Sequence, residues 1–478
     1  MVFSSAIFLF IFLPAVFVLY RFVPSLRWKN ALLAAASLVF YAFGQLWYVP
    51  LFLASVLINY GAGLLLGRMT RGRRAVITAC VALNLLILGV FKYADFAVAN
   101  VNALFGAAIR QPGIELPIGI SFFTFQGLSY SIDVYRDKNS GTKDFLKLLL
   151  FISFFPQLIA GPIVKYHDIA EQIDDRNCTG EETAAGIRRF IVGLSKKVLI
   201  ANAVGLTADR VFNEFLPASG LGLDWRLAWL GAVCYTLQIY FDFSGYSDMA
   251  IGLARMFGFR IRENFNLPYA ALSIRDFWRR WHISLSSWFK EYLYIPLGGN
   301  RKGRGRAALN RLIVFFCTGI WHGANWTFVF WGLGHGVLSS LEGVGAIPAD
   351  KLKNSLLGRF FCRLYTLLAV TLLFVVFRAD DLASAFTMIG AMFRFQTAPF
   401  ASFELRRMLS AASVFVLILA ILLSGRLTEK LRERFSASER LRGPAALALR
   451  SALCLGLYLL SILSLSRGGF NPFIYFQF

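Results

Sequence analysis

Leu312-Ile-Val-Phe-Phe-Cys-Thr-Gly-Ile-Trp-His-Gly-Ala-Asn-Trp-Thr-Phe-Val-Phe-Trp331 is an apolar run with one histidine, His322, near its middle. A helix needs about 20 mostly apolar residues to cross a bilayer, so this run is long enough to span one. An ionisable side chain at that depth is costly unless it faces a wet cavity or a partner, which makes function the default interpretation of His322. Asn325, three residues on, would share its helix face. A second histidine, His282, lies 40 positions earlier (322 − 282).

The composition indicates an all-α polytopic membrane protein. Of the 478 residues, 57% are hydrophobic and 16% are charged, and the mean hydropathy is +0.60. Soluble domains carry roughly 25% charged residues. The net charge of +22 includes basic segments at 68–74, 301–306 and 426–450, which the positive-inside rule assigns to the cytoplasm. Because the positive-inside rule explains most of this charge, we expect no nucleic-acid partner. The basic cytoplasmic face would attract anionic lipid or a phosphate-bearing donor.

The apolar stretches predict about eleven spans in a single domain over residues 1–478. The first stretch has no basic leader and no small-residue cleavage pattern, so we expect it to be retained. The six cysteines show no paired spacing, so neither a disulfide framework nor a metal site follows. The aromatic segment 470–478 suits an interfacial anchor. The expected spans lie near 2–23, 31–48, 50–67, 75–93, 144–162, 190–207, 226–243, 309–331, 359–377, 410–424 and 447–466.

Residues 273–294 read as one interfacial amphipathic helix. Its aromatic side chains repeat at spacings of three and four, which is typical of one helix face. A second row, with Arg275, Arg279, His282 and Ser286, has the same spacing and would face water or a cavity. Pro296 and the paired glycines that follow end the pattern.

Two histidines in a polar pocket within the membrane suit acyl transfer. A hydroxyl that attacks a thioester needs a general base, and imidazole titrates nearest to neutral pH. The Asn325 amide or a tryptophan indole could stabilise a developing oxyanion. We expect Arg279, Arg280 and Lys290 to hold donor phosphates. The sequence has none of the motifs GxSxG, P-loop, HExxH and GxGxxG, which leaves hydrolase, nucleotide-driven and zinc-peptidase functions without support.

Each of these polar residues also has a structural interpretation. His322 could be a packed histidine bonded to a neighbouring helix, and His282 an interfacial histidine on an amphipathic helix. His335 lies among glycines, which favours a role in close helix packing. Asp242 and Asp248 could line a cavity or act as cap and turn residues.

Four blocks of sequence resemble the membrane-bound O-acyltransferase (MBOAT) family. They are Tyr240-Phe-Asp-Phe-Ser-Gly-Tyr-Ser-Asp248, Asp276-Phe-Trp-Arg-Arg-Trp-His282, Tyr292-Leu-Tyr-Ile-Pro-Leu-Gly-Gly-Asn-Arg-Lys302 and Ile320-Trp-His-Gly-Ala-Asn-Trp326. The first block and the opening Met1-Val-Phe-Ser-Ser5 are similar to the bacterial branch that O-acetylates alginate. The resemblance covers essentially the whole chain. The two histidine blocks at this spacing are its most specific part.

The resemblance implies an MBOAT-like multi-helix funnel with a central tunnel and re-entrant or interfacial helices, with the core motif region over 240–336. It implies that His322 is the main catalytic residue and that His282 is the second one. The residues predicted to support them or to line the tunnel are Asn325, Trp321, Asp248, Tyr246 and Asp242.

The resemblance also implies a cytoplasmic thioester donor, either acetyl-CoA or an acyl carrier protein, and no permanently bound cofactor. In the alginate-type branch, the acetyl group passes at the bacterial inner membrane to a separate periplasmic acetyltransferase within a glycan-biosynthesis complex. The same chemistry on peptidoglycan or cellulose, and D-alanyl transfer, stay open as alternatives. A non-catalytic transporter of an acyl group or glycan precursor is the alternative of another class, although the sequence has no internal repeat to support it.

Overall fold

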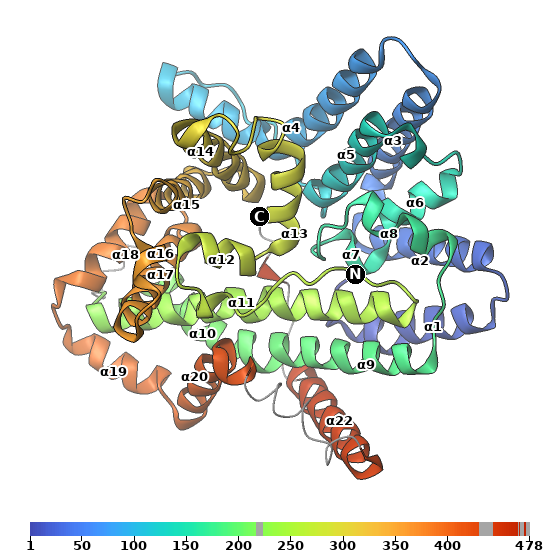
Figure 1. The fold of residues 1–478 in the computed structure, drawn as a ribbon. Helices are drawn as coiled ribbons and strands as arrows, with labels where there is room; N and C mark the ends of the chain where they lie inside the picture. Colours follow the sequence, from blue (N-terminus) through green and yellow to red (C-terminus); the bar gives the residue numbers. More distant parts are fainter. Residues whose placement is uncertain (217–222, 430–442, 467, 469–472, 475–478) are drawn as a thin grey trace. The chain divides into compact units, whose positions relative to one another are not determined.

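The computed structural model describes residues 1–216, 223–429, 443–466, 468 and 473–474, and every regular element within them is helical (Figure 1). This confirms the all-α prediction. Residues 430–442 of the expected basic segment, and all of the expected C-terminal anchor except 473–474, lie outside the described residues. The chain divides into two compact units, Met1–Phe190 with Ser247–Glu263 and Ile191–Tyr246 with Asn264–Phe478. The single domain over 1–478 stays a prediction.

In unit 1, α5 (Ile120–Arg136) packs against α3 (Val49–Arg68) and α4 (Arg73–Phe105) and is buried along almost its whole length. Asn59 on α3 donates to the Asn84 side chain on α4 at 3.0 Å and accepts from the Ser131 hydroxyl on α5 at 2.8 Å. Polar side chains of this kind join helices in apolar surroundings. The other main helices of the unit are α1 (Leu13–Phe22), α2 (Leu26–Gln45), α6 (Phe145–Ser153), α7 (Phe155–Leu158), α8 (Tyr166–Asp174) and most of α9 (Gly180–Ser195).

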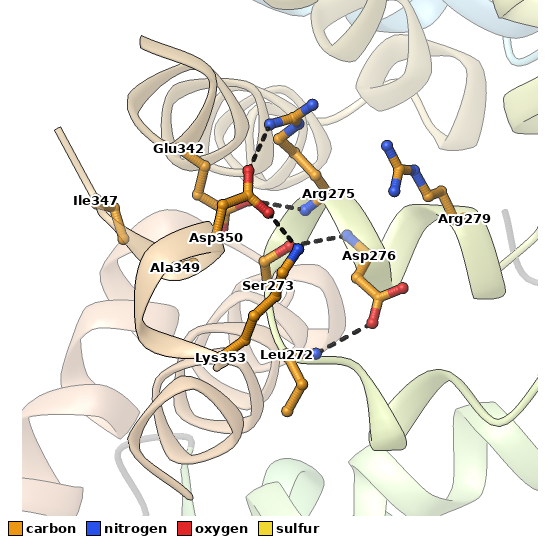
Figure 2. A pocket seen from close by; sticks show the side chains of 10 residues that line it. All are labelled: Leu272, Ser273, Arg275, Asp276, Arg279, Glu342, Ile347, Ala349, Asp350 and Lys353. Carbon is orange, nitrogen blue, oxygen red and sulfur yellow. Dashed lines mark hydrogen bonds and ion pairs between the residues drawn. The ribbon is translucent and has the colours of Figure 1, made fainter. Parts of the chain in front are cut away.

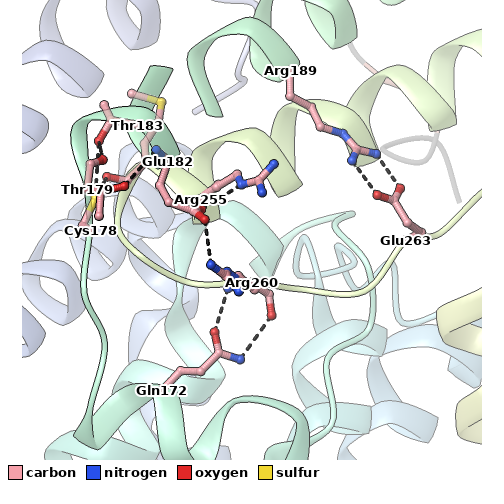
Figure 3. A network of polar contacts seen from close by, with 10 residues as sticks. Gln172, Cys178, Thr179, Glu182, Thr183, Arg189, Arg255, Arg260 and Glu263 are labelled. Carbon is pink, nitrogen blue, oxygen red and sulfur yellow. Dashed lines mark hydrogen bonds and ion pairs between the residues drawn. The ribbon is translucent and has the colours of Figure 1, made fainter. Parts of the chain in front are cut away.

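Unit 1 also contains an ionic network that fixes the chain between 257 and 263 (Figure 3). The Arg260 backbone N–H donates to the Gln172 side chain at 2.7 Å, and the Arg260 guanidinium pairs with Glu182. Glu263 pairs with Arg189, which also binds Asp248 at 2.7 Å. Each of these contacts joins residues 257–263, or Asp248, to α8 or α9. Together they hold the backbone in place as far as Glu263.

Unit 2 contains α14 (Gly303–His322), α15 (Trp326–Val344) and α17 (Leu356–Arg378), and its hydrophobic core takes most of its residues from 200–215, 227–243 and 370–379. α14 and α15 approach closely at two glycines: a Cβ on Gly319 or Gly332 would lie 2.4 Å from a backbone oxygen of the other helix. Small residues allow such close helix packing in membranes. The other main helices are α10 (Asn202–Arg210), α11 (Trp225–Met256, which ends in unit 1), α12 (Ile274–Arg280), α13 (Ile283–Phe289), α16 (Ala349–Leu352), α18 (Leu382–Arg394), α19 (Pro399–Met408), α20 (Ala411–Ser424) and α22 (Pro444–Ser466).

Five helical stretches in the described residues are long and apolar enough to cross a membrane, and six if the bent pair α19–α20 forms one span. They are Leu26–Arg68, Arg73–Phe105, Gly180–Phe215, Leu356–Arg378 and Leu447–Ser466. Leu26–Arg68 has 43 residues and contains two of the expected spans, 31–48 and 50–67. About 20 residues suffice for one crossing, so this stretch is long enough for two. The total of about eleven stays a prediction.

The expected single span at 309–331 is wrong. α14 ends at His322, Gly323 to Asn325 are extended, and α15 starts again at Trp326. The Asn325 side chain caps α15 by accepting the Thr327 N–H at 3.0 Å. A Cβ on Gly323 would lie 2.1 Å from the Phe328 ring, so the turn depends on glycine. His322 and Asn325 therefore do not share a helix face.

The expected single helix at 273–294 is also wrong. α12 ends at Arg280 and α13 begins at Ile283, followed by a π-helical turn over Lys290–Tyr294. Between the two helices His282 takes up the left-handed conformation, with φ 45° and ψ 52°. A non-glycine residue there costs of order 1–3 kcal/mol, so contacts elsewhere in the fold must hold it. The sequence analysis placed His282 on one helix face with Arg275 and Arg279. Because the helix breaks before His282, the three residues do not share a helix face.

Candidate active site

The His282 side chain is fully buried, with 0% of its surface exposed. Its Nδ1 lies 3.2 Å from the Asn264 side-chain oxygen. Its ring meets the Phe243 ring at right angles, with 4.7 Å between centroids. This burial contradicts the interpretation of His282 as an interfacial histidine that faces water.

His322 is the last residue of α14 and is 3% exposed. Aromatic rings surround it: Trp321 and Trp331 lie 5.0 Å away between centroids and Phe377 lies 5.3 Å away, all nearly edge-on. The His282 ring centroid is 6.4 Å from that of His322. The two imidazoles are therefore too far apart for a direct hydrogen bond, but they belong to one cluster. The sequence motifs thus point to two side chains that the fold brings together.

Trp321 contacts both histidines, since its ring centroid lies 5.9 Å from that of His282 as well. A supporting role for Trp321 stays a prediction. Asn325 does not join the cluster: besides capping α15, its amide donates to the Asp380 carbonyl at 2.8 Å. The expected oxyanion contact from this amide therefore has no support in the geometry.

A third histidine, His335, is packed inside the aromatic core of unit 2. It is 0% exposed and stacks on Phe277, with 6.0 Å between centroids and 3° between ring planes. Trp278 and Trp331 each meet it edge-on at 5.2 Å. Neither ring nitrogen has a hydrogen-bond partner among the described residues. This environment fits the packing role inferred from its glycine neighbours.

Glu342 is a residue of this region that the sequence analysis missed. Its carboxylate is buried on α15 and accepts the Ile274 N–H at 2.6 Å. It also accepts the Arg275 N–H at 2.9 Å (Figure 2). A carboxylate at this place bonds two of the N–H groups that a helix start leaves without partners. Glu342 therefore fixes the start of α12, the helix that ends just before His282. Glutamate near the end of an expected apolar helix was the signal available.

The acids of α11 have ion-pair partners. Asp242 is buried with Lys197 and accepts the Ile474 N–H at 2.9 Å, while the Tyr246 ring packs on Phe473 at 4.4 Å. Asp248, in unit 1, pairs with Arg189 at 2.7 Å. Phe243 on α11 contacts His282, and the sequence analysis missed this residue as well. A tunnel-lining role for the two acids and Tyr246 stays a prediction.

Two of the three expected phosphate-binding residues line pockets of unit 2. Arg279 borders a polar pocket of about 210 Å³ between α12, α15 and α16 (Figure 2). Lys353 beside Asp350 lowers the pKa of that carboxyl, and Arg275 and Arg279 add to the effect. Arg280 instead pairs with Asp276 at 3.0 Å, one helical turn back.

Lys290 borders a second pocket, of about 230 Å³, together with Arg275 and Arg311. Its walls include the Trp278, Phe289 and Phe315 rings. Thr318, which also lines it, lies on α14 one turn before His322, or about 6 Å along the axis. The pocket, called the basic aromatic pocket below, therefore reaches from cationic side chains toward the histidine cluster.

Comparison with known proteins gives the family. The model of the membrane-bound O-acyltransferase family matches residues 118–344, which include both candidate histidines. Probable alginate O-acetylases of Azotobacter vinelandii and Pseudomonas putida are each 40% identical to the chain, over 100% of both proteins. The chain belongs to the membrane-bound O-acyltransferase family. A peptidoglycan O-acetyltransferase of Helicobacter pylori is 38% identical over 82% of this chain and 80% of its own length.

Family membership confirms the resemblance found in the sequence motifs. This member of the family is a multi-pass membrane protein and an O-acetyltransferase that uses an acyl donor. Its matched region begins at 118 and ends at 344, so it contains α12 to α15 and the histidine cluster.

Proposed function

We propose that this O-acetyltransferase takes an acetyl group from a thioester donor on the cytoplasmic side of the bacterial inner membrane and supplies it for O-acetylation of an exported, alginate-type glycan. The observation that carries the proposal is the buried pair His282 and His322 in one cluster. The glycan class is supported by relatives named for alginate that align over the whole chain.

In the proposed reaction, His322 is the general base. It removes the proton from an acceptor hydroxyl while the hydroxyl oxygen forms a bond to the acyl carbon of the thioester. The carbon–sulfur bond then breaks, and the imidazole returns the proton to the departing sulfur, so the products are an ester and a free thiol. His282 acts as the second member of the pair, and the rings around His322 exclude water from the thioester.

The basic aromatic pocket is the proposed donor site. Lys290, Arg275 and Arg311 offer positive charge to donor phosphates, and the aromatic walls suit the apolar part of the donor. Three buried polar atoms on its lining, Trp278 Nε1, Ser286 Oγ and Arg311 Nη1, have no hydrogen-bond partner in the described part of the chain. Buried polar groups normally have partners, so a ligand that supplies them fits this pocket.

The basic loop next to this pocket supports a donor on the cytoplasmic side. Asn300 lines the pocket and is followed directly by the basic segment 301–306, which the positive-inside rule assigns to the cytoplasm. Both acetyl-CoA and an acyl carrier protein present a phosphate and a thioester on a flexible arm, so both remain donors under this proposal. The acceptor would be a separate periplasmic acetyltransferase in a glycan-biosynthesis complex.

The first test is thiol release from acetyl-CoA by the protein in nanodiscs, with and without a candidate periplasmic acceptor protein. Wild type should release thiol in the presence of acceptor, and His322→Ala should lose this by about 10²–10⁴-fold while its level in the membrane stays near normal. His335→Phe is the matched control, because it also removes a buried imidazole but keeps a ring on Phe277. Loss of the protein itself in His322→Ala would support the packing role instead.

The relative from Helicobacter pylori supports one alternative substrate, since it is named for peptidoglycan and is 38% identical over 82% of this chain. Acetyl analysis of the glycans made by a deletion strain separates the two substrates. The transporter alternative predicts movement of intact donor without thiol release. Absence of thiol release with acetyl-CoA, but release with an acylated carrier protein, would change the donor and keep the reaction.

A further inference from the structure

The break that carries His282 is held by a segment that precedes it in the chain. Backbone hydrogen bonds run from the Asn266 N–H to the Arg280 carbonyl and from the Ile283 N–H to the Asn264 carbonyl, each at 2.9 Å. These bonds lie on the two sides of His282 and tie the break to residues 264–266. The left-handed conformation at His282 is therefore supported by tertiary contacts.

The Asn264 side chain lies inside this break and is 0% exposed. Its oxygen is 3.1 Å from the Ser284 backbone nitrogen and 2.8 Å from the Ser284 hydroxyl. A backbone N–H can only donate, so the amide atom that faces it must be the oxygen and not the NH₂ group. The Ser284 N–H thus determines which way the Asn264 amide is turned, an assignment that otherwise has to be inferred.

The orientation of Asn264 determines in turn the proton position on His282. The same amide oxygen lies 3.2 Å from His282 Nδ1. An amide oxygen only accepts, so a hydrogen bond at this distance requires the proton to be on Nδ1. The Ser284 hydroxyl also lies 3.4 Å from Nδ1, but its one proton goes to the Asn264 oxygen at 2.8 Å, so toward the imidazole it can only accept. An unprotonated Nδ1 would place its lone pair against that oxygen. A neutral imidazole carries a proton on one nitrogen only, so Nε2 is then the acceptor.

We propose that Asn264 is a positioning residue that fixes His282 as the Nδ1–H tautomer and leaves its Nε2 unprotonated, able to accept a hydrogen bond within the histidine cluster during acyl transfer. The inference rests on the proposed function for the role of His282, but the tautomer itself does not depend on that role. Asn264 reaches the reaction only through His282.

The tautomer can be read directly by ¹⁵N NMR of histidine-labelled protein in nanodiscs. The chain contains only four histidines, so single-residue variants assign all signals. In the wild type at neutral pH, His282 should show a protonated Nδ1 and an unprotonated Nε2. In Asn264→Leu, which removes the acceptor, Nδ1–H should lose its preference and the Nε2–H form should become populated.

Two further variants separate positioning from a general structural effect. Asn264→Asp keeps an oxygen that accepts from both Ser284 N–H and His282 Nδ1–H, so it should keep the Nδ1–H tautomer and recover part of the activity lost in Asn264→Leu. Ser284→Ala removes the hydroxyl contact and leaves the backbone and imidazole contacts, so the tautomer should not change. Acetyl transfer in Asn264→Leu should fall by about 10²-fold or more with little change in the donor KM.

A wild-type His282 with its proton on Nε2 would overturn the inference, and so would an Nδ1–H tautomer that persists unchanged in Asn264→Leu. If Asn264→Leu does not fold, the wild-type and Asn264→Asp spectra still decide the question. Full activity of His282→Gln would contradict the role of His282 in the proposed function and leave the tautomer assignment intact.

Discussion

The two histidines of the cluster are equally buried but are held in different ways. His282 lies at a strained break and is oriented by directed hydrogen bonds from the Asn264 segment. His322 ends a regular helix and is surrounded by the edges of aromatic rings. The hydrogen bond to Asn264 fixes which nitrogen of His282 carries a proton, and the rings around His322 fix the position of its imidazole. This difference suits a pair in which His282 is preset and His322 is the general base.

The largest effect is expected when the histidines of the pair are replaced, singly and together. His322→Gln and His282→Gln should each lower kcat by about 10²–10⁴-fold. The kcat of the double variant should be only a few-fold below that of the less active single variant. Groups that act as a unit give such non-additive losses. Single-turnover thiol release measures all three. Losses that multiply in the double variant would mean that the histidines act independently.

The next effect concerns the polar support of His282. Glu342→Ala leaves the buried Ile274 N–H and the partly buried Arg275 N–H at the start of α12 without this acceptor, and the buried group alone costs about 1–3 kcal/mol. We expect a lower unfolding midpoint in detergent and a fall in kcat of up to about 10²-fold, because α12 ends just before His282.

Glu342→Gln is the matched control for this change. The glutamine amide has one accepting oxygen where the carboxylate has two, so it replaces only part of the hydrogen bonding to the two N–H groups. The unfolding midpoint of Glu342→Gln should therefore lie between those of wild type and Glu342→Ala. An unfolding midpoint for Glu342→Ala equal to that of wild type would show that the start of α12 does not depend on this carboxylate.

A smaller effect is expected from the aromatic support of His322. Trp331→Phe keeps a ring beside His322 but loses part of the contact that the indole makes with His322 and Phe377. This loss should lower the free energy of unfolding by about 0.5–1.5 kcal/mol. Trp331→Leu should cost more and lower kcat further, since no ring edge remains. The donor KM should stay near that of wild type in both, because Trp331 does not line the basic aromatic pocket. A large KM change would move the donor closer to His322 than proposed.

The contrast between the histidines also explains what the sequence could and could not predict. His322 was predictable, since a histidine in an apolar run needs a reason and the Trp-His-Gly-Ala-Asn-Trp block supplies one. The turn after it was missed although its signals, a glycine followed by an asparagine cap, were present.

The break at His282 could not be predicted from local periodicity. The break depends on Asn264, which lies 18 residues before His282. It also depends on Glu342, which bonds the start of α12 at Ile274, 68 residues before it. The three- and four-residue spacing of Trp278, Trp281, Leu285 and Trp288 is compatible with one helix, and tertiary hydrogen bonds override it. Phe243 and Glu342 were missed for the same reason, because their importance lies in partners distant along the chain.

The smallest effect is expected from Arg280, next to the His282 break. The sequence analysis expected both Arg280 and Lys290 to bind donor phosphates. In the structure the Arg280 guanidinium pairs with Asp276 at 3.0 Å, whereas Lys290 lines the basic aromatic pocket. A partly exposed pair of this kind contributes about 0.3–0.5 kcal/mol. Arg280→Gln should therefore leave the KM for acetyl-CoA within about twofold of wild type, while Lys290→Gln raises it and weakens its salt dependence, because a charge that meets donor phosphates is lost. Steady-state thiol release at low and at high salt compares the two variants. Equal increases in KM would place Arg280 in the donor site and would mean that its pair with Asp276 opens when the donor binds.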